Sequence, residues 1–198
     1  MAVIQQMLIG IGAANRVYAT FDPAHSGGGI VLSNGNLTAT MSGTSQNYTI
    51  SNIGKSEGKW YWEFLISTLN WSAGTLYVGC GNTADLGGGP GYTLPGVGWV
   101  DRSSSSTSQT YINNIIITTG LSQISQGNVI GFALDADAKT MSFYLNNSLI
   151  CTESAIGAGA VYASAAMYRL TAGAVVANFG ASAFTYSAPS GFNSGLYQ

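Results

Sequence analysis

The 198 residues suit one β domain with a short appended segment, and the 46% of hydrophobic residues are ample for a core. Only 7% are charged, against about a quarter in ordinary soluble domains, and the net charge is −2. A chain without a basic surface is not expected to bind nucleic acid, and so small a charge is more typical of a component of an assembly than of a freely diffusing monomer.

The first residues of the chain, 1–14, form an apolar run. The run lacks a basic start and is too short to span a bilayer, so we expect neither a signal peptide nor membrane insertion. An apolar terminus in water needs a surface to cover, which can be this domain or a neighbouring subunit. We therefore predict a docking arm at residues 1–17 and one domain at 18–198. The side chains expected to dock are Val3, Ile4, Met7, Leu8, Ile9 and Ile11.

Short apolar strands separated by turn signals follow the arm. Asn34-Gly35 predicts a tight turn between two short strands within residues 30–40. Residues 58–67 form the clearest strand, and 76–81 form another. The strand at 58–67 is predicted from the period of two that places four apolar side chains on one face, namely Trp60, Trp62, Phe64 and Ile66. The glycine-rich stretch 82–97 predicts a loop.

Residues 127–147 predict a β-hairpin at the centre of a sheet. In the second half, Met141, Phe143 and Leu145 alternate with polar residues, which is typical of a half-buried strand. In the first half both faces are apolar, so that strand is expected to be covered on both sides. Asp135 and Asp137 lie in the turn between the halves, where aspartates bond their own backbone.

The remaining segments also read as strands and loops. We expect strands at 98–100, 148–153, 162–170 and 174–179, an extended segment at 111–119, a serine-rich loop at 102–109 and an irregular tail at 181–198. Many short strands between turns indicate an antiparallel sandwich.

The two cysteines, Cys80 and Cys151, lie within apolar runs. Two readings remain open: a pair of buried free thiols, or one disulfide between neighbouring strands. Neither cysteine has the spacing of a metal site.

Several of these segments, in chain order, resemble the SPRY (B30.2-like) domain. The motifs are Gly58-Lys-Trp-Tyr-Trp-Glu-Phe, Val78-Gly-Cys-Gly, Gly127-Asn-Val-Ile-Gly-Phe-Ala-Leu-Asp, Met141-Ser-Phe-Tyr-Leu-Asn-Asn and the closing Val176-Ala-Asn-Phe-Gly with Phe184-Thr-Tyr and Pro189-Ser-Gly-Phe. They cover roughly residues 18–197. The resemblance implies an all-β fold, an antiparallel two-sheet β-sandwich (a SPRY/concanavalin-like jelly roll), that uses no cofactor or catalysis and binds partners through loops at one end.

The loops depart from the intracellular members of the family, because glycine, serine and asparagine replace their charges. Together with the apolar arm, this looks most like the SPRY domains of bacteriophage virion proteins. The resemblance thus implies a place in the virion, on the capsid as decoration or on the tail as a fibre.

The sequence contains few of the residues and motifs that catalysis requires. His25 is the only histidine, no Gly-x-Ser-x-Gly motif is present, and Asp135 and Asp137 lack the other ligands of a calcium loop. We therefore expect no metal, no cofactor and no enzymatic activity. A glycan hydrolase with two carboxylates among Glu57, Glu63 and these aspartates is the weaker alternative.

Recognition is the function that remains. Residues expected in loops combine aromatic rings, amides and the few charges, a mixture that suits a protein hot spot or a sugar platform. The predicted ligand-binding residues are Asn70, Trp71, Tyr92, Asp101, Arg102, Tyr111, Tyr168 and Arg169. Trp71 is the first candidate, because a tryptophan in a loop needs a reason, whereas Trp99 is expected in the core.

The leading hypothesis is a non-enzymatic virion component that docks through its arm on capsid or tail proteins, or on copies of itself, and displays the sandwich outward. The alternative is an adhesin that binds a host surface protein or glycan through the loops at one end.

Overall fold

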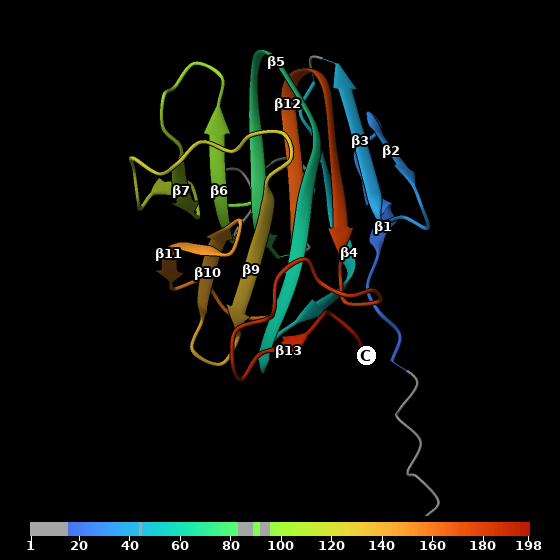
Figure 1. Ribbon diagram of the computed structural model, residues 1–198, viewed down its shortest axis with the longest axis vertical. Helices are drawn as coiled ribbons and strands as arrows, with labels where there is room; N and C mark the ends of the chain where they lie inside the picture. The colour runs from blue at the N-terminus through green and yellow to red at the C-terminus, as the bar shows by residue number, and fades with distance from the viewer. Residues whose placement is uncertain (1–15, 44, 83–88, 92–95) are drawn as a thin grey trace, which may run out of the picture.

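The computed structural model describes residues 16–43, 45–82, 89–91 and 96–198. Within those ranges the chain forms thirteen strands and no helix (Figure 1). The strands are β1 (Phe21–Ser26), β2 (Ile30–Ser33), β3 (Thr38–Gly43), β4 (Asn47–Lys55), β5 (Lys59–Gly81), β6 (Gly96–Arg102), β7 (Gln109–Ile112), β8 (Ile115–Ile116), β9 (Val129–Asp135), β10 (Thr140–Leu145), β11 (Ser148–Ser154), β12 (Val161–Asn178) and β13 (Asn193–Ser194).

The strands form two layers that share β5 and β12. One layer has the order β1-β4-β12-β5-β6-β7-β8, and the other has the order β2-β3-β12-β5-β9-β10-β11. Both shared strands bend from one layer into the other, and their mutual register shifts between Tyr168 and Ala172 (Figure 1). All pairings are antiparallel except the short β13 against β5. The predicted antiparallel jelly-roll sandwich is confirmed.

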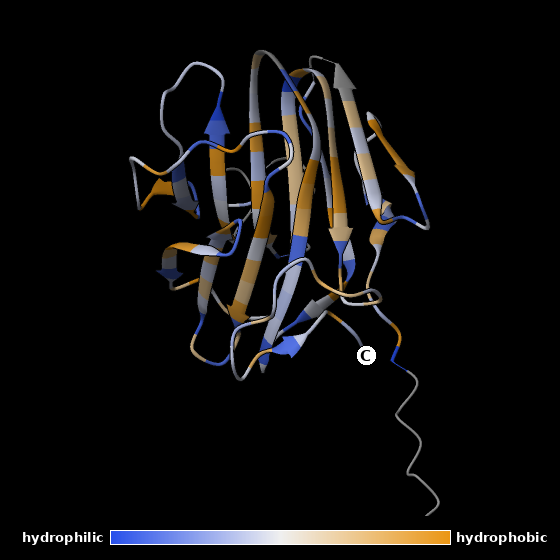
Figure 2. Ribbon diagram, viewed as in Figure 1, coloured by the Kyte–Doolittle hydropathy of each residue, from blue (hydrophilic) through white to orange (hydrophobic). Residues whose placement is uncertain are grey.

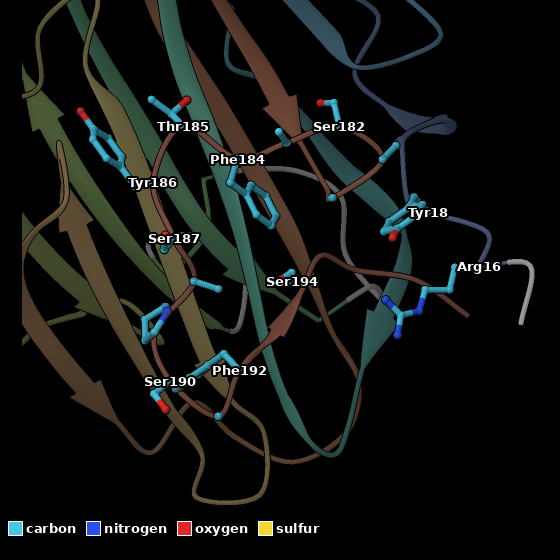
Figure 3. A pocket seen from close by; sticks show the side chains of 16 residues that line it. Arg16, Tyr18, Ser182, Phe184, Thr185, Tyr186, Ser187, Ser190, Phe192 and Ser194 are labelled. Atoms are coloured by element: carbon cyan, nitrogen blue, oxygen red, sulfur yellow. The ribbon is translucent and has the colours of Figure 1, made fainter. Parts of the chain in front are cut away.

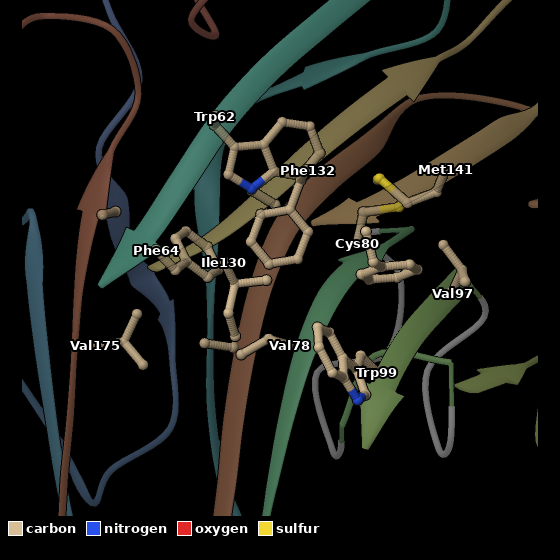
Figure 4. Close-up of a cluster of buried hydrophobic side chains, with 14 of the residues drawn as sticks. Trp62, Phe64, Val78, Cys80, Val97, Trp99, Ile130, Phe132, Met141 and Val175 are labelled. Atoms are coloured by element: carbon tan, nitrogen blue, oxygen red, sulfur yellow. The ribbon is translucent and has the colours of Figure 1, made fainter. Parts of the chain in front are cut away.

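The core lies between the layers and is rich in aromatic rings (Figure 4). Trp62 of β5 stacks on Phe132 of β9, with ring centroids 5.2 Å apart and planes 9° apart. Phe64 and Phe143 contact the same Phe132 ring edge-on. Trp99 is fully buried, as expected. Of the alternating side chains that predicted the strand at 58–67, Trp62, Phe64 and Ile66 therefore lie in the core, and Trp60 packs against it partly buried. Figure 2 shows hydrophobic stretches along β9 and the middle of β6, and a hydrophilic tip of β6.

The hairpin predicted at 127–147 is confirmed as β9 and β10. Their register runs from Thr140 opposite Asp135 to Leu145 opposite Ile130. β9 also pairs with β5, and β10 with β11, so the hairpin is internal to its layer. Asp135 accepts a hydrogen bond of 2.9 Å from the Ala138 amide and forms an ion pair of 2.9 Å with Lys59. Both contacts lower the pKa of its carboxyl. The turn aspartates are structural.

Several boundaries differ from the predictions. The segments 58–67 and 76–81 are parts of one continuous strand, as are 162–170 and 174–179. The extended segment expected at 111–119 is interrupted by a tight turn between β7 and β8, in which Asn113 and Asn114 adopt positive φ of 48° and 69°. Asparagine tolerates this left-handed conformation better than most residues. Strand β4 was not identified from the sequence.

The described ends of the chain lie together. Val17 and Gln198 exchange two backbone hydrogen bonds of 3.1 Å each, and the Arg16 guanidinium lies 4.2 Å from the ring centre of Tyr197. In Figure 1 these ends lie at the opposite end of the sandwich from the bend of β5 and β12. The predicted docking residues lie outside the described part of the chain, namely Val3, Ile4, Met7, Leu8, Ile9 and Ile11.

Candidate functional site

The bends of β5 and β12 gather most of the predicted ligand-binding residues at one end of the sandwich. Asn70 and Trp71 pair with Ala172 and Leu170, and Tyr168 pairs with Thr75, which also pairs with Arg102 at the end of β6. We call this the bend end. The prediction that these binding residues lie in loops is wrong, because Arg102 belongs to β6, Tyr168 and Arg169 belong to β12, and Asn70 and Trp71 belong to β5. Hydrogen bonding to β12 keeps the backbone extended through a polar stretch that reads as a loop.

A cluster of tyrosines covers the outer face of the layer next to the bend end. It comprises Tyr48, Tyr77, Tyr111 and Tyr168 together with Val100 and Ala166, and we call it the tyrosine face. The strand register explains the cluster, because Tyr48, Ala166, Tyr77 and Val100 lie side by side across four strands. Tyr48 and Tyr168 are half-buried, and Tyr77 and Tyr111 are buried.

Two arginines border the tyrosine face. Arg102 donates a hydrogen bond of 3.0 Å to the Tyr111 hydroxyl, which also accepts one of 2.8 Å from the Gln109 amide. Arg169 is exposed, and its guanidinium lies 5.0 Å from the centre of the Tyr168 ring. Aromatic rings with adjacent guanidinium groups offer stacking, apolar contact and planar hydrogen-bond donors on one surface. Such a surface can bind a protein segment or a sugar ring.

The sequence missed two members of the tyrosine face, Tyr48 and Tyr77. A signal for Tyr77 was available, since Tyr77 alternates with the core residues Leu76 and Val78 and must face outward. Gly89, in the described segment 89–91 after β5, lies close to its ring. A Cβ on Gly89 would lie 2.4 Å from the Tyr77 ring, so this glycine allows the loop backbone to approach the ring closely.

Asp101 and Tyr92 differ from the other predicted binding residues. Asp101 is fully buried, which contradicts a role as an exposed ligand contact. Its carboxylate accepts a hydrogen bond from the Ile124 amide, 23 residues away, and burial raises the pKa of the carboxyl. Asp101 therefore anchors the segment that follows β8. Tyr92 lies outside the described residues.

A concavity of about 800 Å³ lies at the end of the sandwich where the described ends of the chain meet (Figure 3). The C-terminal segment 180–194 forms most of it, and Arg16 and Tyr18 complete its wall. Its lining combines serine hydroxyls with the rings of Phe184, Tyr186 and Phe192. This concavity contains none of the predicted ligand-binding residues.

Several titratable side chains make contacts within the sandwich. Glu153 accepts hydrogen bonds from the hydroxyls of Thr110 and Thr118 at 2.6 and 2.7 Å, and the exposed His25 pairs with Asp22 at 2.7 Å. Cys80 and Cys151 are free, and burial raises the pKa of each thiol to about 12. A thiol with so high a pKa is not an activated nucleophile.

No group of three or more histidine, cysteine, aspartate or glutamate side chains that could hold a metal ion occurs in the described ranges. The same ranges contain no helix with the length and apolar character needed to cross a membrane.

Solved structures with the same architecture identify the fold. The SPRY domain of human HERC1 matches with a TM-score of 0.64 and 25% identity, over 79% of this chain and 96% of that one. The fold is that of a SPRY domain. The PSpry domain of TRIM65 matches this SPRY-like sandwich with a TM-score of 0.58 and 18% identity, over 82% of this chain and 90% of that domain. Stonustoxin matches with a TM-score of 0.57 and 22% identity, over 82% of this chain and 27% of that one.

Sequence similarity points the same way. The chain is 30% identical over 149 residues to the E3 ubiquitin-protein ligase TRIM9 of Drosophila melanogaster, which covers 70% of this chain. The chain spans only 19% of the length of that relative. No family model matches the chain. The predicted resemblance to the SPRY domain is confirmed at the level of the domain.

Proposed function

We propose that this chain is a non-enzymatic binding protein of a bacteriophage virion, in which a SPRY-like sandwich is docked on capsid or tail proteins through residues 1–17 and displayed outward. The observation that carries the proposal is the placement of the two ends. Arg16, the first described residue, lies beside the C-terminal residues, and the bend end lies at the other end of the sandwich (Figure 1). A domain held at Arg16 presents the bend end to the surroundings.

The composition supports an assembly as the setting. With 7% charged residues and a net charge of −2, copies of the chain repel one another weakly. The apolar residues of the arm gain stability only where a neighbouring surface removes them from water. Virion proteins, including further copies of this chain, supply such surfaces at high local concentration.

The absence of catalysis is part of the proposal. The carboxylates of Glu63, Asp101 and Glu153 are buried and accept hydrogen bonds from backbone amides or hydroxyl groups within the sandwich. Acid–base catalysis of glycan hydrolysis needs two carboxylates that face a common groove. Each of these three is held by a different set of residues, Glu63 by Thr185 and Tyr186, Asp101 by Ile124, and Glu153 by Thr110 and Thr118.

Deletion of residues 1–14 tests the docking function. We expect the full chain to co-sediment with purified virions and the deletion variant to remain in the unbound fraction, because the apolar contact that holds the domain has been removed. The thermal unfolding of the two proteins, followed by circular dichroism, provides the control for folding. Equal co-sedimentation of a folded deletion variant with the virions would rule out docking through the arm.

An adhesin that binds a host surface protein or glycan is the second candidate, and the stacking of Arg169 on Tyr168 favours it. Aromatic rings beside guanidinium groups are common in hot spots, and one such residue contributes about 2 kcal/mol or more to binding. In a screen of host surface polysaccharides and proteins, Tyr168→Ala should weaken binding about 30-fold, whereas the exposed Leu149→Ala on the other layer should not. Absence of any binding by the unaltered protein leaves the virion-docked decoration as the function.

A further inference from the structure

A cavity of about 230 Å³ lies on the outer face of the layer that contains β9, away from the tyrosine face. The C-terminal segment forms one wall, through Ser182, and the β2–β3 turn forms the other. Figure 3 shows Ser182, Phe184 and Thr185 on the segment that crosses β5. The floor is the sheet itself.

Two neighbouring rows of side chains cross this floor, and their chemistry differs. One row is aliphatic, because Val176 of β12, Leu65 of β5 and Val129 of β9 lie opposite one another. Two residues along β5, the next row places Asn178 beside Glu63. All five of these residues line the cavity. An apolar strip therefore leads to a carboxylate and an amide.

Glu63 is a buried carboxyl group whose hydrogen-bond partners are all neutral. Its side chain is 2% exposed and accepts hydrogen bonds of 2.8 Å from the amides of Thr185 and Tyr186 and one of 3.1 Å from the Tyr61 hydroxyl. The ion pairs among the described residues lie elsewhere, at His25–Asp22 and Lys59–Asp135. A buried carboxylate gains most from a cation that completes its hydrogen bonding.

We propose that this cavity binds a primary alkylammonium group, with its methylene chain on the aliphatic row and its ammonium at Glu63. Rows two residues apart on a strand are separated by about 7 Å, which matches the four-carbon stem and terminal ammonium of a lysine side chain. The partially exposed Leu65, at 37%, provides the apolar surface on which such a stem lies. A lysine of a protein partner and a free alkylamine share this chemistry.

Titration of the full chain with n-butylammonium, followed by the NMR signals of the Thr185 and Tyr186 amides, tests the proposal. We expect saturable shifts of both signals, and binding at least tenfold weaker for 1-butanol, which has the same alkyl chain without the charge. Equal binding of the two probes, or no shift with n-butylammonium, would overturn the site.

Two variants separate the cavity from the fold. Glu63→Gln removes the charge and should abolish the preference for n-butylammonium, and Glu57→Gln, which removes an exposed charge, should not change it. If Glu63→Gln loosens the C-terminal segment, Ser182→Trp provides the decision, because Ser182 is exposed and a large ring there blocks the cavity while Glu63 stays intact. Unchanged binding in Ser182→Trp contradicts the proposal.

The source of the ammonium is distinguished with a lysine residue blocked at both ends, compared with its Nε-acetyl form. Tighter binding of the blocked lysine than of n-butylammonium assigns the site to a protein partner, and weaker binding assigns it to a free amine. Binding of the acetylated form at equal strength would refute recognition of the charge. This cavity is independent of the tyrosine face and of the arm, so its failure leaves the proposed function untouched.

Discussion

Replacement of Phe132 by alanine is expected to lower the free energy of unfolding by about 3–5 kcal/mol. Phe132 has no exposed surface, and its ring contacts Trp62, Phe64 and Phe143. Truncation removes the stacked partner of Trp62 and leaves a cavity between the two layers, which the strands on both sides cannot close without losing register. Chemical denaturation of the two proteins, monitored by tryptophan fluorescence, measures the difference.

The matched control for Phe132 is Leu149→Ala. Leu149 lies in β11 of the same layer but is 58% exposed, so its truncation should change the free energy of unfolding by at most about 0.5 kcal/mol. A loss below 1 kcal/mol for Phe132→Ala would mean that the aromatic cluster is not the centre of the core.

The alternating strands and the central hairpin were predictable because their signals are local. Met141, Phe143 and Asp135 reveal their roles within a few residues, through a period of two and through a turn that aspartate favours. The motif order that resembles the SPRY domain added the layer architecture. These parts of the fold need no information about distant contacts.

The bends of β5 and β12 could not be read from the sequence in the same way. Around Trp71 the polar residues suggest a loop, yet β12 supplies backbone partners about a hundred residues away. Local propensity is outweighed where a neighbouring strand provides the backbone hydrogen bonds. The predicted loop residues nevertheless gather at one end, since the two strands bend together.

The contacts of the polar residues at the bend end also could not be predicted from local sequence. Asp101 was expected to be exposed, because a charged residue at the end of a short strand usually is. Its partner is the Ile124 amide, which no local pattern reveals. Arg102 and Tyr168 were expected in loops but belong to β6 and β12, and the tyrosine face itself depends on the register of four strands.

The second large effect is expected for Glu63→Ala, which should lower the free energy of unfolding by about 2–4 kcal/mol. Hydrogen bonds to a charged group contribute about 1.5–3 kcal/mol each, and Glu63 accepts two from the amides of Thr185 and Tyr186. Without the carboxylate, β13 still pairs with β5, but residues 184–186 keep the edge-on contact of Phe184 with Tyr61, at 5.1 Å, in place of the two amide hydrogen bonds. Such a contact contributes only about 0.5–1.5 kcal/mol.

The release of the segment separates this effect from a general loss of stability. In Glu63→Ala, amide hydrogen exchange at Thr185 and Tyr186 should accelerate much more than at Phe132 and Phe143 in the core, because a local opening exposes the segment before the sandwich unfolds. Glu57→Ala, at an exposed position, should leave both the exchange pattern and the stability unchanged. Uniform acceleration across the segment and the core would instead show that Glu63 stabilises the whole sandwich and does not specifically hold the C-terminal segment on β5.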